Sequence, residues 1–374
     1  MSFELFVPGR LCLLGEHSDW AGGFRTSNPE IPLGATIVVG TGTEGLHAVC
    51  QPHPDSLILY STSDTGEKIG PYECKMELSE LLKAAKAGGF FSYACGVAYS
   101  ILLNHDVKGM EIHNDVTTLP IKKGLSSSAA TCVLVARAFS TAYDLKLTTR
   151  GEMDYAYRGE ILTPSKCGRM DQACAYGSKP VILSYDGDMV DVRELIVAEP
   201  IHLVVADLNG GKDTVAILKK LQQAYPFPTC ETHEGLHHLL GHINQDIIKR
   251  AVTAISRGEI LKLAELYQEA QSAFDTFAGA ACPEQLTAPL LHSTLEHPGL
   301  KEYIFAGKGV GSQGDGTVQF LCKNEAAQAK VLQIVKKEIN LTCFKITIPV
   351  SDSLKNEDED EGEVEDEEKK CAIA

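Results

Sequence analysis

Apolar and polar residues alternate in short runs along the first third of the chain, a pattern typical of half-buried β-strands. The runs predict strands at about residues 36–40, 46–51, 57–62 and 110–118. From about residue 125 to 176 the apolar residues recur with a helical period instead. One more strand is predicted at about residues 180–185, so the N-terminal half is expected to be an α+β unit.

The second half begins with a strongly apolar strand at residues 201–207, after a turn at 186–188. Helices are predicted at about 214–223, 235–256, 258–276, 283–296 and 325–338, and strands at 317–322 and 343–350. We therefore expect an N-terminal domain at residues 1–190, a C-terminal domain at 191–350 and a tail at 351–374. The tail is highly acidic and almost without apolar residues, which predicts disorder.

The chain is strongly acidic, which bears on the partners it could bind. The formal net charge is −16, and half of it lies in residues 356–374, which hold ten acidic residues and two lysines. A broad nucleic-acid-binding surface is therefore not expected. Hydrophobic residues make up 44% and charged residues 22% of the chain, values typical of a globular protein.

No leader peptide is visible at the N-terminus, and no apolar run approaches the roughly 18 residues of a membrane span, which predicts a cytoplasmic protein. The twelve cysteines include no CxxC pair and lie mostly in apolar segments. We interpret them as reduced core thiols and not as a disulfide framework or a zinc site. The chain ends in Cys371-Ala372-Ile373-Ala374, which fits a prenylation signal or a chance ending. The acidic residues before it disfavour membrane anchoring.

A glycine followed by serines stands directly before an apolar helical run, in the segment PIKKGLSSSAA at residues 120–130. Backbone N–H groups at such a helix start favour a phosphate group. The alternative is that the serines only cap the helix. No GxxxxGK[ST] motif occurs in the chain.

Two further segments carry candidate chemistry. Arg10, Glu16, His17 and Asp19 flank a glycine-bounded turn, where they could hold sugar hydroxyls or simply be solvated. Glu160 and Asp171 supply the two carboxylates that phosphoryl transfer needs, one for Mg²⁺ and one for the attacking hydroxyl. A surface ion pair between Arg169 and Asp171 is the alternative for the second segment.

Together the three segments resemble the GHMP kinases, a family named for galactokinase, homoserine kinase, mevalonate kinase and phosphomevalonate kinase. The sugar branch is the nearer match, because GEHSDWAGG at residues 15–23 is similar to the galactokinase signature GEHTDYNGG. Residues 167–172, CGRMDQ, likewise resemble CGxMDQ. The resemblance covers residues 5 to 350, and mevalonate kinases usually lack an acid where Asp19 stands.

The resemblance implies a two-domain α+β GHMP kinase fold with the active site between the domains. The N-terminal domain would be like domain 2 of ribosomal protein S5 and the C-terminal domain ferredoxin-like. ATP would be the co-substrate, Mg²⁺ the metal ion and a small-molecule sugar the acceptor, in a monomer or homodimer.

The same resemblance implies roles for single residues. Asp171 and Arg10 would be catalytic, Asp171 as base and Arg10 beside the transferred phosphoryl group. The substrate would be bound by Glu16, His17, Asp19 and Gly168. ATP would be bound by Gly124, Leu125, Ser126, Ser127, Ser128 and Ala129, and Mg²⁺ by Ser128 and Glu160.

Two departures from the family pattern concern the acceptor side. The third motif, usually GGGxGG, here contains Lys308, Gln313 and Asp315. After the strand at 201–207, where galactokinases usually carry a tyrosine and two arginines, the chain has Lys212, which could face an acidic substrate group or solvent. The preferred sugar therefore need not be galactose.

The resemblance predicts an ATP-dependent sugar kinase that acts without a covalent intermediate, most simply a galactokinase-like sugar 1-kinase. A mevalonate or heptose kinase of the same family is one alternative. A regulator that binds sugar and ATP without transfer is the other. Acceptor turnover distinguishes the three.

Overall fold

The computed structural model describes the chain except for residues 64, 120–124, 165–166 and 355–374. Its first sheet has seven strands in the order β4-β3-β5-β2-β6-β7, with β1 also paired to β2. The strands are β1 (Phe3–Leu14), β2 (Gly34–His53), β3 (Ser56–Thr62), β4 (Lys68–Lys75), β5 (Gly109–Thr117), β6 (Val181–Asp186) and β7 (Met189–Glu194). Neighbours are antiparallel except for β3 and β5. The predicted acidic tail lies outside the described residues from residue 355 onward.

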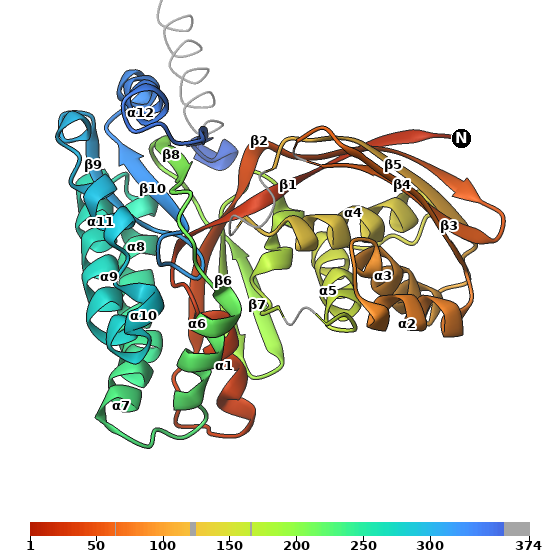
Figure 1. The fold of residues 1–374 in the computed structure, drawn as a ribbon, viewed down its shortest axis with the longest axis horizontal. Coiled ribbons are helices and arrows are strands. Elements are labelled where there is room, and N and C mark those ends of the chain that lie inside the picture. Colours follow the sequence, from red (N-terminus) through yellow and green to blue (C-terminus); the bar gives the residue numbers. More distant parts are fainter. Residues whose placement is uncertain (64, 120–124, 165–166, 355–374) are drawn as a thin grey trace, which may run out of the picture.

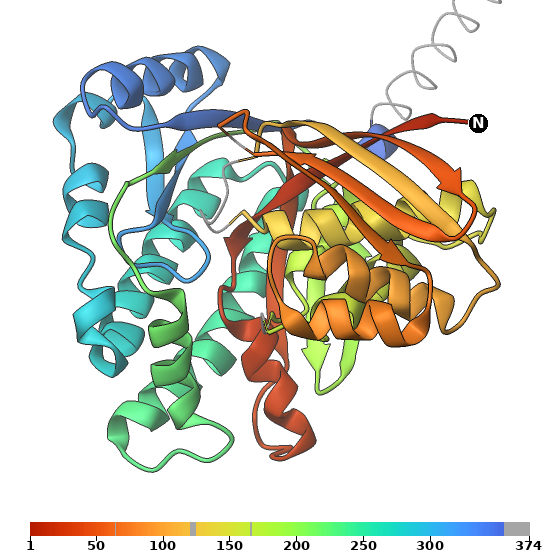
Figure 2. The same cartoon turned by 45° about the vertical axis from the view of Figure 1, so that its right-hand side comes forward.

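The two strands predicted at 36–40 and 46–51 are one continuous strand, so the predicted break was wrong. Two glycines in this stretch allow close packing. A Cβ at Gly40 would overlap the carbonyl of Gly177, and a Cβ at Gly45 would overlap that of Val7. Figure 1 and Figure 2 show β1 and β2 running from the outer part of the first sheet toward the second half of the molecule, where both contact α8 (Asn244–Ser256).

Helices cover one face of the first sheet (Figure 1). They are α2 (Leu78–Ala87), α3 (Ser92–Leu102), α4 (Ser127–Ala142) and α5 (Thr149–Glu160). α4 packs on β1 and β2 through small apolar residues such as Ala129 and Cys132. α3 and α5 approach so closely that a Cβ at Gly96 would overlap the Gly159 carbonyl. This packing brings Glu160, the last residue of α5, toward the N-terminal end of α4.

The second sheet is antiparallel and has the strand order β11-β8-β10-β9. Its strands are β8 (Ile201–Asp207), β9 (Ile304–Gly309), β10 (Thr317–Cys322) and β11 (Cys343–Ile348). Leu203 and Val205 join the core shared with the first sheet, whereas Val204 and Ala206 join a core with α12 (Glu325–Lys337). Both faces of β8 are therefore buried, which explains its unbroken apolar run.

The other helices are α1 (Ser18–Gly23), α6 (Thr214–Leu221), α7 (Glu231–His238), α9 (Ile260–Ala281), α10 (Pro283–Leu286) and α11 (Pro289–Leu295). The helix predicted at 235–256 is α7, a π-helical turn at Leu239–Ile243 and then α8. The helix predicted at 283–296 divides into α10 and α11. Ala288 has a left-handed conformation there, and Pro289, which cannot continue the hydrogen bonds of α10, begins the new helix.

The first sheet ends at Glu194 and the second begins at Ile201. The division at 190/191 stays a prediction, and it falls within β7. In the part of the chain that the structure describes, no helix is both long and apolar enough to span a membrane. Eleven cysteines are described, all as free thiols, and all but Cys167 and Cys230 are buried.

Candidate active site

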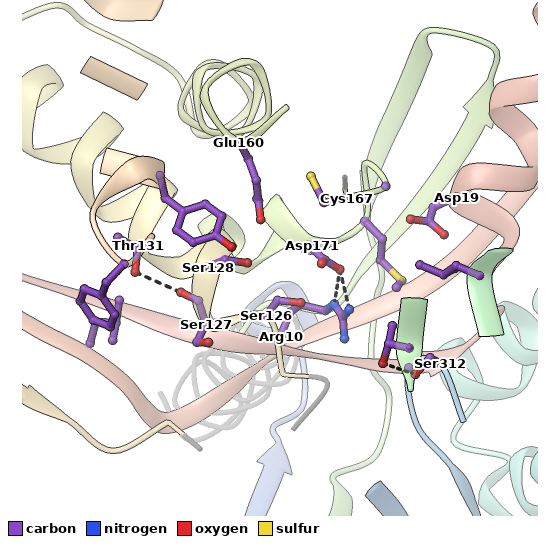
Figure 3. Close-up of a pocket in the computed structure, with 18 of the residues that line it drawn as sticks. Arg10, Asp19, Ser126, Ser127, Ser128, Thr131, Glu160, Cys167, Asp171 and Ser312 are labelled. Carbon is purple, nitrogen blue, oxygen red and sulfur yellow. Dashed lines mark hydrogen bonds and ion pairs between the residues drawn. The ribbon is translucent and has the colours of Figure 1, made fainter. Parts of the chain in front are cut away.

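A cavity of about 830 Å³ lies where the N-terminal end of α4, the turn after β1 and the loops of the second half meet (Figure 3). Among its lining residues are Arg10, His17, Asp19, Ser126, Ser127, Ser128, Glu160, Gly168, Asp171, Lys212 and Ser312. Most of the residues singled out in the sequence are thus gathered in one place. They come from segments up to 302 positions apart in the sequence, Arg10 to Ser312.

The turn after β1 is fixed by backbone conformation. Gly15 has φ 93°, and a Cβ there would overlap the carbonyl of Ala35, so glycine is required at this position. His17 has φ 67° and immediately precedes α1. The turn leads Asp19 and Trp20 into the cavity wall.

His17 is held by two aromatic residues. Its Nδ1 accepts a hydrogen bond of 3.0 Å from Nε1 of Trp20, and its ring stacks on Phe274 with 5.7 Å between centroids. Burial lowers the pKa of His17 to about 4, and the positive charge of Lys212 acts in the same direction. His17 is therefore neutral at pH 7. Because the indole N–H can only donate, the histidine proton is on Nε2.

Asp19 is buried against the backbone of Gly168, where a Cβ would overlap its carboxylate. Burial raises the pKa of Asp19 to about 6, and the negative charge of Asp171 raises it further. Gly168 was predicted to bind substrate. In the structure its lack of a side chain leaves room for the carboxylate of Asp19.

Glu16 does not line this cavity. Its Oε1 accepts a hydrogen bond from Nζ of Lys308, and the side chains of both are almost fully buried. Burial raises the pKa of Glu16, and the charge of Lys308 opposes that rise. The structure therefore places the predicted sugar ligand Glu16 in an internal ion pair.

Arg10 and Asp171 form the ion pair at the centre of the cavity (Figure 3). Nε and Nη2 of Arg10 both donate to Oδ1 of Asp171, at 3.1 Å and 2.5 Å. Arg10 is on β1, and Asp171 begins the short helix Asp171–Tyr176. The backbone of Arg10 also donates to the carbonyl of Leu125, so β1 positions the loop before α4.

The start of α4 supplies the serines. Ser126 is left-handed at φ 60° and caps no amide with its side chain, and its hydroxyl has no partner among the described residues. Ser126, Ser127 and Ser128 line the cavity, whereas Leu125 and Ala129 are buried in the core. Only the backbone of those two residues could serve a nucleotide. Gly124, also predicted to bind ATP, lies outside the described residues.

Glu160 is 1% exposed and faces the start of α4. Its Oε2 accepts a hydrogen bond of 2.8 Å from Gln172, while Oε1 has no partner in the described part of the chain. Burial raises the pKa of Glu160 to about 7, the charge of Asp171 adds to this rise, and a hydrogen bond from Ser128 opposes it. Gln172 was missed as a site residue, although it directly follows Asp171 in the sequence.

Asp171, Glu160 and Ser128 offer hard oxygen atoms, the donors that Mg²⁺ prefers. The unpartnered Oε1 of Glu160 gives this set a vacant acceptor. No cluster of three or more His, Cys, Asp or Glu side chains suited to a metal occurs among the described residues. A Mg²⁺ ion that takes its remaining ligands from nucleotide phosphates and water needs no such cluster.

The three residues that depart from the third motif are held by structural contacts, Lys308 in β9 and Gln313 and Asp315 in the loop after it. Lys308 pairs with Glu16, as described above. Asp315 faces away from the cavity, because its Oδ1 accepts a hydrogen bond of 2.9 Å from the backbone N–H of Leu291 in α11. Gln313 is buried with φ 63°, and its carbonyl accepts a hydrogen bond of 3.2 Å from Nζ of Lys212. Gly311 and Ser312 are left to line the cavity.

Two aromatic residues near the start of α3, Phe91 and Tyr93, lie in different surroundings. Phe91 packs on Tyr72 with ring centroids 5.1 Å apart, as expected of a core residue. Tyr93 lines the cavity, together with Phe90, Thr62 and Asn114. These residues extend the cavity beyond the serines, and their contribution was not apparent from the sequence.

The sequence is similar to known proteins over part of its length. Residues 82–178 match the family model of the GHMP kinases N terminal domain. The galactokinase of Thermococcus kodakarensis is 29% identical over 206 residues, which are 54% of this chain and 52% of that protein. The galactokinase of Streptomyces coelicolor is 26% identical over 207 residues, 54% of this chain and 49% of that one. The match thus spans about half the length of these curated relatives.

The fold is similar to that of solved structures over nearly the whole chain. Lactococcus lactis galactokinase complexed with galactose has a TM-score of 0.68 at 18% identity, with 93% of each chain covered. Methanococcus jannaschii mevalonate kinase has a TM-score of 0.67 at 17% identity, with 94% of this chain and 99% of that chain covered. Residues 82–178 thus match the GHMP kinases N terminal domain, and the chain has the fold of the GHMP kinases, which confirms the resemblance seen in the sequence.

Proposed function

We propose that the protein transfers the γ-phosphoryl group of ATP to a hydroxyl of a monosaccharide, as a galactokinase-like sugar kinase acting at the anomeric carbon. One observation carries the proposal. The Arg10–Asp171 pair lies in one cavity with the N-terminal end of α4 and the turn that holds His17 and Asp19. The helix start is suited to bind phosphate, and the turn is suited to bind hydroxyls. The carboxylate of Asp171 lies in the same cavity as both.

The N-terminal end of α4 is the proposed site of the ATP phosphates. The first amides of a helix lack partners within the helix, and its dipole favours negative charge there. Ser126 leaves these amides uncapped by its side chain. The hydroxyls of Ser127 and Ser128 stand at the same wall of the cavity.

Mg²⁺ would be held by Ser128 and Glu160, whose donor atoms fit a hard cation. When bound, the ion neutralises charge on the nucleotide phosphates. Burial of Glu160 against Gln172 and Ser128 fixes the direction of its carboxylate. The protein thereby keeps the acid in place before the nucleotide arrives.

Asp171 is the proposed acid facing the acceptor hydroxyl. The acceptor oxygen forms the new bond to phosphorus as the bond from phosphorus to the ADP oxygen breaks, and Asp171 accepts the hydroxyl proton. Arg10 orients Asp171 and places positive charge beside the phosphoryl group. His17 and Asp19 hold other hydroxyls of the sugar. If the chain divides into domains at 190/191, the turn of His17 and Asp19 belongs to the N-terminal domain and the loop of Ser312 to the C-terminal domain. The proposed site then lies between the two domains.

A screen of ADP release tests the proposal. The purified protein with ATP and Mg²⁺ is offered galactose, N-acetylgalactosamine, arabinose, fucose, galacturonate, glucuronate, a heptose and mevalonate. Turnover with a monosaccharide supports the proposal, and the position of the phosphate follows from NMR of the product. Turnover with mevalonate alone would contradict the sugar assignment. Binding of ATP and a sugar without any turnover would instead indicate a regulator.

A further inference from the structure

Two cysteines face each other between an edge strand and a helix of the first half of the molecule. Cys74 is on β4, which is the edge strand of the first sheet, and Cys95 is on α3. Both are free thiols, with exposed fractions of 8% and 0%. Neither lines the cavity of the candidate active site, so the proposed function gives them no role.

The neighbouring aromatic pair places the two thiols opposite each other. Side chains two positions apart on a strand share a face at about 6.8 Å, and side chains four positions apart on a helix share a face at about 6 Å. Tyr72 and Phe91 precede the two cysteines by these intervals, and their rings stack with centroids 5.1 Å apart. The backbone N–H of Cys95 donates to the carbonyl of Phe91, so these two residues are one helical turn apart. Cys74 and Cys95 therefore form the next pair along the strand and the helix.

Hydrogen bonds join the two thiols. Cys74 and Cys95 hydrogen-bond each other, and both hydrogen-bond the hydroxyl of Tyr72. Sγ of Cys95 lies 3.8 Å from Oη of Tyr72. The hydrogen bond with Cys95 lowers the pKa of the Cys74 thiol, whereas this hydrogen bond and burial raise the pKa of Cys95. The pair thus combines a thiol that ionises more readily with one that keeps its proton, and the thiolate is the form that peroxides oxidise.

The edge strand can move more easily than the helix. β4 pairs with β3 on one side only, whereas α3 packs on α2, α4 and α5. A disulfide requires the two sulfur atoms to be about 2.05 Å apart, which is closer than two thiols in contact. We therefore expect β4 to shift toward α3 when the bond forms. The flanking residues Glu73 and Lys75 are exposed, so Cys74 lies directly beneath the surface.

We propose that Cys74 and Cys95 are a redox-sensitive dithiol, which a hydroperoxide oxidises to an intramolecular disulfide between β4 and α3. The Cys74 thiolate attacks one peroxide oxygen, and the O–O bond breaks to give a sulfenic acid and hydroxide. The sulfur of Cys95 then bonds to that of Cys74 as the S–O bond breaks, and the thiol proton leaves with the hydroxide as water. With hydrogen peroxide, two thiols and one peroxide give one disulfide and two water molecules.

The disulfide would strengthen one wall of the cavity from behind. The residues at the start of α3, Phe90 and Tyr93, line the cavity. A bond between Cys74 and Cys95 ties this helix to the sheet and closes a loop that contains all of α2. Closing such a loop stabilises the folded state by restricting the unfolded chain.

Peptide mapping after treatment with peroxide tests the inference. The folded full-length protein is treated with hydrogen peroxide, its remaining thiols are alkylated, and it is digested with trypsin without reduction. Trypsin cuts after Lys75, Lys83 and Lys86, so the two cysteines are on separate peptides. We expect mass spectrometry to detect these two peptides linked through Cys74 and Cys95, and dithiothreitol to separate them.

Two variants and a stability measurement serve as controls. Cys95→Ala should abolish the link, and Cys50→Ala, which removes a buried thiol from β2 of the same sheet, should leave it unchanged. In urea unfolding, the oxidised wild type should have an unfolding equilibrium constant at least about tenfold lower than the reduced wild type. Oxidised and reduced Cys95→Ala should not differ in this way.

Several results would overturn the inference. One is alkylation of both thiols at a peroxide concentration that fully oxidises the exposed Cys230. Others are a link from either thiol to a different cysteine, or a link that forms only in urea. An oxidised wild type less stable than the reduced one would show that the fold does not accommodate the disulfide. Because the assay needs neither ATP nor a sugar, its result does not depend on the proposed function.

Discussion

Three carboxyl groups share the cavity, and burial affects them differently. Asp19 and Glu160 have pKa values raised to about 6 and about 7, in both cases mainly by burial and next by the charge of Asp171. Asp171 is more exposed, with 23% of its side chain accessible, and pairs with Arg10. The cavity therefore holds two carboxyl groups that change charge near neutral pH, which a bound cation would favour in the ionised form.

Glu160 makes stability depend on pH in a defined direction. Its pKa is raised from 4.5 to about 7, so between these values the folded state holds the proton longer than the unfolded chain and stability falls as pH rises. Glu160→Gln removes this loss, and the variant should gain up to about 3 kcal/mol relative to wild type between pH 4.5 and 7. Urea unfolding at several pH values across this range measures the difference in unfolding free energy between the variant and wild type. Glu302→Gln, at an exposed position, is the control. Parallel pH profiles for wild type and Glu160→Gln would contradict the account.

Gly168 tests the geometry of the acceptor turn. In Gly168→Ala the new methyl group overlaps the carboxylate of Asp19, so Asp19 must move. We expect the KM for the acceptor sugar to rise by about tenfold to a hundredfold with little change in the KM for ATP. Steady-state kinetics measure both values, and Gly279→Ala, in a roomy part of α9, serves as the control. An unchanged acceptor KM in Gly168→Ala would show that Asp19 does not contact the acceptor.

At the scale of elements, most strands and helices were predicted from the sequence, whereas the helices α2 and α3 and the edge strands were not. β4 and β7 are edge strands with few buried residues, so their sequences show only weak alternation. β9 was hidden because its six residues run into a glycine-rich loop. The candidate site residues came from short motifs, and the structure brings two of them, Arg10 and Asp171, into contact.

The pairing of Glu16 with Lys308 could not be predicted, because it joins residues 292 positions apart in the sequence. It links the turn after β1 to β9 of the second sheet. Gln319 reinforces the link by donating a hydrogen bond of 2.9 Å to the carbonyl of Cys12. Sequence motifs report local chemistry, whereas this contact depends on how the two sheets dock.

Lys308→Met should cost about 3–5 kcal/mol of unfolding free energy, because it leaves the buried carboxylate of Glu16 without a partner. Glu16→Gln combined with Lys308→Met removes both charges and should recover much of that loss. Urea denaturation of wild type, the two single variants and the double variant gives the free energy of interaction between Glu16 and Lys308. Lys179→Met, which breaks the exposed pair with Glu194, should cost no more than about 1 kcal/mol. A double variant as unstable as the sum of the single variants would refute the pairing.

For the whole molecule, the cavity depends on the meeting of the two halves. The first sheet and its helices supply Arg10, Glu160 and Asp171, and the second half supplies Lys212 and Ser312. Each half alone would present an open and solvated surface. Catalysis by positioning and charge neutralisation requires that both be present, since charges interact more strongly where water is excluded.

The most direct test is ADP release by Asp171→Asn with the acceptor that the screen identifies. We expect kcat to fall about 10²- to 10⁴-fold while the Kd of a non-hydrolysable ATP analogue changes by no more than about twofold. Asp188→Asn, on an exposed turn, controls for the loss of one carboxylate and should retain full turnover. Near-normal turnover in Asp171→Asn would contradict the central claim that this carboxylate faces the attacking hydroxyl.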